Sequence, residues 1–210
     1  MQPSMPDRDT LDVIDFLGRA VAVSGLSQAA FARALGTSAS RMSTYMTGAT
    51  RPSAWFCARA HRLAKALADA SERGLMSAPE TAAEIRRALG AGEAAWAWRM
   101  LLQGRDHLRL MLTDPNYADL DLTGSWEALP GTTGDSGFDA LLAALAFHEF
   151  EEAEHAAPEW TRIEPLEKEW QPPHPFLSPE RVVARTPDWL RRLRIYVPER
   201  DLTSGTLPAP

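Results

Sequence analysis

The stretch from residue 26 to residue 53 is divided by serine and glycine into helical segments too short to fold alone. Ser27 opens a segment that ends at Gly36, and the next segment ends at Gly48. Isolated helices shorter than about 12–15 residues are marginal in water and form through tertiary packing. The stretch therefore predicts short helices that end at these glycines.

The apolar residues of these segments indicate how they pack. Phe31 and Leu35 are four residues apart, and two methionines repeat that spacing in the next segment. Residues four apart share one face of a helix, so each segment offers one apolar face. Gly36 lies between them and adopts a positive φ at little cost, which allows a steep turn. We expect helices over about 27–35 and 38–47 that pack across this turn.

This arrangement resembles the lambda-repressor-like (Cro/Xre) helix-turn-helix family. The resemblance covers about a quarter of the chain and rests on Ser27-Gln28, Gly36, Gly48 and Pro52-Ser53. It implies a bundle of four or five helices that binds double-stranded DNA, with the helix over 38–47 in the major groove.

The resemblance also implies which side chains meet DNA. Gln28 is expected to contact a phosphate, Arg41 a guanine edge or a phosphate, and Arg51 the backbone. The other expected contact residues on the recognition helix are small: Ser38, Ala39, Ser40, Ser43 and Thr44. Small side chains discriminate bases weakly. Specificity is therefore expected to rest on Arg41, on DNA shape or on a second copy of the domain.

The charged residues are unevenly distributed along the chain, and the basic region coincides with the predicted helix-turn-helix. Residues 16–68 contain seven basic residues and none of the 28 acidic residues, although the net charge of the chain is −6. Basic side chains bind phosphates, whereas acidic ones are repelled by them. The two parts are therefore predicted to bind different partners. The alternative is that the arginines only solubilise four packed helices.

The chain is predicted to be mainly α, because Val, Ile and Tyr are scarce while Ala, Leu and Arg are abundant. Residues 113–137 are rich in glycine and are expected to be a loop. Residues 158–187 contain seven prolines and are expected to be mostly irregular. The predicted organisation is a flexible N-terminus over 1–10, a helix-turn-helix domain over 11–75, an acidic helical domain with proline-rich loops over 78–202, and a disordered tail over 203–210.

The acidic part loosely resembles actinobacterial antitoxin-like proteins encoded beside nucleotidyltransferase-like toxins. The resemblance rests on Phe138–Glu149, Ala157–Thr161, Thr186–Leu190, Ile195 and Arg200–Leu202. It implies that this part binds a protein toxin. An acidic run in this part is interpreted first as a solvated helix face, and it would also suit a basic toxin cleft: Glu149, Glu151, Glu152 and Glu154. Formation of a homodimer and binding of a small effector are the other open possibilities.

Other chemistry is weakly indicated. His148 and His155 are seven residues apart, whereas a zinc protease helix needs histidines four apart with a glutamate after the first. Cys57 is the only cysteine, so no internal disulfide is possible. We expect no catalytic residues, no metal and no cofactor, and thus no enzyme. No apolar run is long enough to span a membrane, and the N-terminus lacks an apolar signal core, which favours a cytoplasmic protein.

The sequence therefore predicts a sequence-specific transcriptional regulator that binds double-stranded DNA, most simply a repressor. The alternative is an antitoxin that neutralises a toxin through its C-terminal part and represses its own operon. A DNA-processing accessory protein is a third possibility, but no site for such chemistry is recognisable. The gene beside this one would discriminate between the first two.

Overall fold

The computed structural model describes residues 7–118 and 120–203. The fold is mainly helical, as predicted, and its only β-type pairing among the described residues is an isolated bridge between Trp170 and Ile195. None of the described helices is long and apolar enough to cross a membrane. The chain forms two compact units, which are described separately below; the first comprises the described residues up to Glu80 and Asn116–Gly131, and the second comprises Thr81–Pro115 and the described residues from Thr132.

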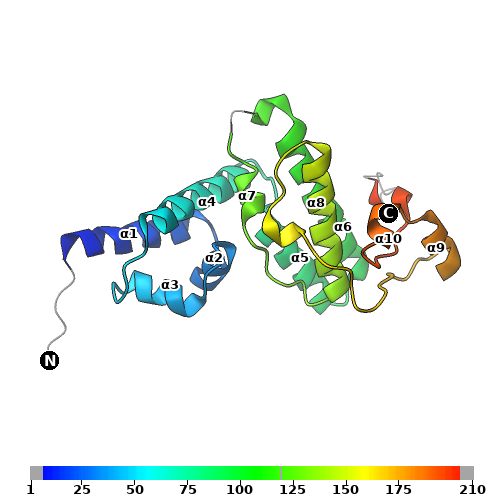
Figure 1. The fold of residues 1–210 in the computed structure, drawn as a ribbon, viewed down its shortest axis with the longest axis horizontal. Coiled ribbons are helices and arrows are strands. Elements are labelled where there is room, and N and C mark those ends of the chain that lie inside the picture. The colour runs from blue at the N-terminus through cyan, green and yellow to red at the C-terminus, as the bar shows by residue number, and fades with distance from the viewer. Residues whose placement is uncertain (1–6, 119, 204–210) are drawn as a thin grey trace. The chain divides into compact units, whose positions relative to one another are not determined.

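The first unit contains α1 (Arg8–Val23), α2 (Gln28–Ala34), α3 (Ala39–Met46), α4 (Ala54–Glu72) and the short α7 (Gly124–Glu127). In Figure 1, α2 and α3 lie below α1 and α4. Each of the first four helices begins after a residue whose side chain accepts a hydrogen bond from the backbone N–H three residues later, which stabilises the first turn. These N-cap residues are Asp7, Ser27, Ser38 and Ser53.

The core of the first unit lies between the apolar faces of these helices. Leu17, Phe31 and Met42 are fully buried and come from α1, α2 and α3. The rings of Tyr45 on α3 and Phe56 on α4 lie 5.0 Å apart and belong to the same core cluster. The predicted packing of the two short helices on each other is therefore confirmed.

The start of α1 differs from the prediction. The helix begins at Arg8, because the Asp7 side chain caps it by accepting a hydrogen bond from the backbone N–H of Thr10. Residues 8–10, predicted to be flexible, are thus helical. Residues 1–6 lie outside the described residues, as do residues 204–210 of the predicted tail.

Residues 120–131, which we call the strap, form part of the first unit although the sequence predicts a loop there. Trp126 is fully buried, and its Nε1 donates a hydrogen bond to the carbonyl oxygen of Met76 at 2.9 Å. Ala128 belongs to the core cluster of α1–α4. Burial of a large aromatic side chain stabilises this short segment, and a single tryptophan leaves no periodic pattern in the sequence. The strap extends the first unit beyond the predicted boundary at residue 75.

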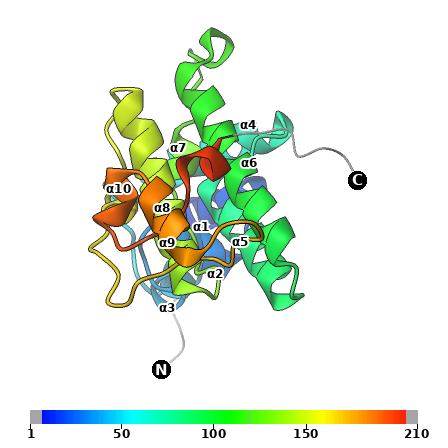
Figure 2. The same cartoon turned by 90° about the vertical axis from the view of Figure 1, so that its right-hand side faces the viewer.

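The second unit is built around α8 (Ser136–Glu152), which packs against α6 (Ala94–Thr113). The two helices run side by side in Figures 1 and 2. Buried residues occur on all sides of α8, which is typical of a helix surrounded by other elements. This unit also contains most of α5 (Ala78–Gly90), which begins in the first unit, and η2 (Glu159–Thr161), α9 (Pro179–Arg185), α10 (Asp188–Arg191) and η3 (Glu199–Leu202).

The proline-rich region is mostly irregular, as predicted, but α9 was not expected within it. Pro179 stands in the first turn of α9, where its missing N–H costs nothing. The irregular chain is held by packing between rings. The Trp170 indole lies 5.4 Å from the Phe138 ring, edge to face, and a side chain at Gly137 would collide with it.

Candidate nucleic-acid interface

The turn between α2 and α3 sets the direction of α3. Gly36 adopts a φ of 71°, as predicted, and its N–H donates to the carbonyl oxygen of Arg33 at 2.8 Å. The N–H of Thr37 donates to the carbonyl oxygen of Ala32 at 2.9 Å. These bonds satisfy the last carbonyl groups of α2 and end the helix. The turn is therefore closed by backbone hydrogen bonds together with the buried pair Phe31 and Met42.

One face of α3 is open to solvent and carries most of the predicted contact residues. Five of them are exposed, and Thr44 is half-buried: Ser38, Ala39, Ser40, Arg41 and Ser43. The Thr44 hydroxyl donates to the carbonyl oxygen of Arg41 at 2.8 Å, so its proton is already used within the helix. The hydroxyl groups of Ser40 and Ser43 make no such bond among the described residues. They are free to donate to another molecule.

The two predicted arginines differ in their surroundings. Arg41 lies in the first turn of α3, is exposed and has no ion-pair partner in the described part of the chain. Arg51 is also exposed, but its guanidinium forms an ion pair with the Asp7 carboxylate. Hydrogen bonds from Thr10 and the charge of Arg51 lower the pKa of Asp7. A phosphate must therefore compete with Asp7 for Arg51, whereas Arg41 is available.

Gln28 is the first residue of α2 and is half-buried. It lies on the element that precedes the recognition helix, so it comes from a different helix than the other predicted contacts. The contacts of Gln28 and of the α3 face with DNA stay a prediction.

The acid-free stretch of the sequence is not an acid-free surface. Asp69 pairs with Lys65, and the Arg59 guanidinium lies 5.6 Å from the centre of the Trp55 ring. Arg59 and Arg62 also share a cavity with carboxylates from the strap. The sequence alone does not reveal these acidic neighbours, because Asp69, Asp121 and Glu127 lie outside residues 16–68. Nor does it reveal Trp55, whose side chain is 67% exposed.

A family model described as a helix-turn-helix domain matches residues 15–73 of the chain. These residues form a helix-turn-helix domain. Its α2 and α3 are the two helices that the Gly36 turn joins. The match ends within the residues that follow α4, so the strap and the second unit lie outside it. No curated protein and no solved structure was found to match the chain.

The acidic run of the second unit contains one buried glutamate and three exposed ones. Glu149 is only 4% exposed, and its carboxylate accepts hydrogen bonds from Nε and Nη2 of Arg109 at 2.8 and 2.7 Å. These bonds raise the pKa of Arg109. The prediction that Glu149 faces a partner is therefore wrong. Glu151, Glu152 and Glu154 are exposed at the end of α8 and remain accessible.

His148 of α8 and His155, which follows this helix, do not belong to a metal-binding group among the described residues. The His148 ring stacks on the Trp189 ring at 4.5 Å with an interplanar angle of 12°. Among the described residues, no three His, Cys, Asp or Glu side chains are placed to hold a metal ion. Burial raises the pKa of the Cys57 thiol, which disfavours the reactive thiolate.

Proposed function

We propose that this protein is a transcriptional regulator that binds double-stranded DNA sequence-specifically and acts as a repressor. The observation that carries the proposal is the exposed face of α3 within the helix-turn-helix domain. In such domains the second helix of the pair enters the major groove. Repression requires only that the operator be occupied, so the proposal needs no catalytic group.

The α3 face suits this role by its shape and by one charge. Its small side chains allow the helix backbone to approach the base edges closely, while Ser40 and Ser43 supply hydroxyl groups. Arg41 is long enough to reach beyond them and forms the bidentate contact that reads guanine. Arg41 therefore supplies most of the discrimination between bases, and Gln28 supplies a phosphate contact.

Replacing Arg41 with alanine is expected to weaken binding to the operator by about 1–3 kcal/mol and to relax its sequence preference. The measurement is a competition gel shift on a DNA site first selected with the full chain from a random library. Arg73→Ala, which removes an exposed arginine at the end of α4, serves as the control. An equal loss on operator and random DNA would instead assign Arg41 to a phosphate.

Replacing Asp7 with asparagine is expected to tighten DNA binding severalfold at low salt, because it releases the Arg51 guanidinium. Asparagine is also a good N-cap, so α1 is retained. The measurement is fluorescence anisotropy with labelled duplex over a salt series. Asp9→Asn removes the same charge from an exposed neighbour in α1. If both variants gain equally, the effect is one of net charge and not of the pair.

The second candidate function is that of an antitoxin. The observation that favours it is the exposed group Glu151, Glu152 and Glu154 at the end of α8, which suits a basic protein surface. Co-purification with the nucleotidyltransferase-like product of a neighbouring gene, compared with a variant carrying glutamine at these three positions, tests it. A homodimer on a palindromic operator is compatible with either function, and a symmetrical footprint would support it.

A further inference from the structure

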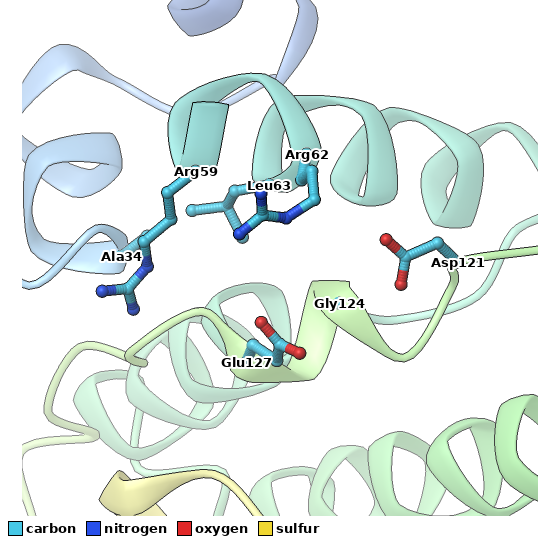
Figure 3. Close-up of a pocket in the computed structure, with 7 residues that line it drawn as sticks. All are labelled: Ala34, Arg59, Arg62, Leu63, Asp121, Gly124 and Glu127. Atoms are coloured by element: carbon cyan, nitrogen blue, oxygen red, sulfur yellow. The ribbon is translucent and has the colours of Figure 1, made fainter. Parts of the chain in front are cut away.

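A small charged cavity lies between α4 and the strap, within the first unit. It has a volume of about 40 Å³ and is lined by Ala34 of α2, by Arg59, Arg62 and Leu63 of α4, and by Asp121, Gly124 and Glu127 of the strap. Figure 3 shows both guanidinium groups and both carboxylates directed toward this shared space. No direct ion pair joins these described residues across it, and the volume suffices for a few bridging water molecules.

The strap is held in place by apolar packing that is independent of these charges. Trp126 and Leu122 are fully buried. The N–H of Leu129 donates to the carbonyl oxygen of Ala34 at 3.3 Å, at the end of α2. Gly124 lies so close to α4 that a Cβ atom there would be 3.1 Å from the Cβ of Ala66. The backbone that carries the two carboxylates is therefore held beside the arginines.

The α4 surface beside the strap, where Arg59 is half-buried and Arg62 is exposed, has the composition of a nucleic-acid-binding surface. The strap therefore acts on this surface through its charge and does not cover it. Arg59 and Arg62 are three residues apart, so they project from the same side of a helix. The face continues to Trp55, which is exposed and whose ring centre lies 5.6 Å from the Arg59 guanidinium. Arginine binds the DNA backbone through its charge and bidentate hydrogen bonds, and removal of nearby carboxylates strengthens that attraction.

We propose that Arg59 and Arg62 form a second DNA-binding surface of the helix-turn-helix unit, which the strap masks through Asp121 and Glu127. The inference rests on the proposed function, because it assigns a further contact to the same DNA-binding unit. The masked surface contributes charge without base recognition, so masking suppresses non-specific binding in favour of the α3 face.

The test uses the full chain with both strap carboxylates converted to amides, Asp121→Asn with Glu127→Gln. Binding to random-sequence duplex is measured by fluorescence anisotropy from low to high salt. Two additional phosphate contacts are expected to steepen the slope of log Kobs against log salt by about 2 and to raise the affinity at low salt. Adding Arg59→Gln and Arg62→Gln to this variant is expected to restore the parental slope.

A matched control separates masking from net charge. Asp15→Asn with Glu72→Gln removes two exposed carboxylates of the same unit that have no ion-pair partner among the described residues. This control is expected to keep the parental slope. If it steepens the slope as much as the strap variant, or if the variant with four changes keeps the gain, the inference is overturned. The single variant Glu127→Gln, at an exposed position, provides the same comparison if the double strap variant unfolds.

The outcomes for the inference and for the proposed function are separable. Operator binding by the parent chain and its loss in Arg41→Ala report on the proposed function. If the parent chain binds DNA and Arg41→Ala weakens that binding while the strap variant keeps the parental slope, only the inference fails. If neither the parent nor any variant binds DNA, the proposed function and the inference both fail.

Discussion

Replacing Trp126 with alanine is expected to lower the free energy of unfolding of the first unit by about 3–5 kcal/mol. The side chain is fully buried, and its Nε1 donates to the carbonyl oxygen of Met76. The substitution removes a large apolar surface from the core and leaves a buried carbonyl without this donor. Because the strap borders α2 and α4, the loss destabilises the scaffold that holds the recognition helix. DNA binding at 37 °C should fall with it.

Unfolding in urea is monitored by far-ultraviolet circular dichroism. If the two units unfold in distinct transitions, each transition is fitted on its own. Trp55→Ala is the control, because Trp55 is 67% exposed and surface substitutions change stability by about 0.5 kcal/mol or less. Equal effects of the two substitutions would contradict the role of the strap in the core. So would a Trp126→Ala protein with unchanged stability.

Replacing Glu149 with alanine is expected to cost the second unit about 3–5 kcal/mol of unfolding free energy. Glu149 accepts two hydrogen bonds from Arg109 and lies 3.8 Å from Nε of Arg105. Arg105 is itself only 4% exposed and donates to the carbonyl oxygen of Leu202 at 2.6 Å. Removal of the carboxylate leaves a buried guanidinium with less compensating charge, which is why the cost is large.

The matched control is Glu152→Ala, which removes an exposed glutamate from the same helix. Thermal unfolding of the two variants is compared at one pH and salt concentration. Glu152→Ala is expected to lie within about 0.5 kcal/mol of the parent. Should Glu149→Ala prove as stable as Glu152→Ala, the buried ion network would not be the main tie between α6 and α8. The same pair separates partner binding from stability, since only Glu152 can face a partner.

Local features of the sequence were sufficient for the helix-turn-helix domain. The N-cap serines, Gly36 and the four-residue spacing of Phe31 and Leu35 act within one or two helical turns. Their effects can therefore be predicted without knowledge of the tertiary structure. The exposed residues of α3 follow from the same reasoning, because the buried position of Met42 determines which face remains open. The contact of these residues with DNA stays a prediction.

Features that depend on residues far apart in the sequence could not be predicted from local patterns. The strap binds α4 across more than fifty positions of sequence, and no local pattern marks Trp126 as its anchor. From the sequence alone, Glu149 is one member of an acidic run. In the structure, α6 places Arg109 beside it. From the sequence alone, Arg51 is expected to be available to a phosphate. In the structure, Asp7 at the start of α1 forms an ion pair with it.

The sequence by itself therefore determined the short helices, the turn between them and the position of the recognition face, because caps, glycine conformation and helical periodicity act over a few residues. Only the tertiary structure decided which charges remain available. Ion pairing and burial depend on which distant residues meet. Asp7, which pairs with Arg51, lies outside this stretch, as do Asp121 and Glu127, which line one cavity with Arg59 and Arg62. The acid-free stretch 16–68 therefore forms a surface on which some basic side chains have acidic neighbours. Arg41 of the recognition helix is exposed and has no ion-pair partner among the described residues.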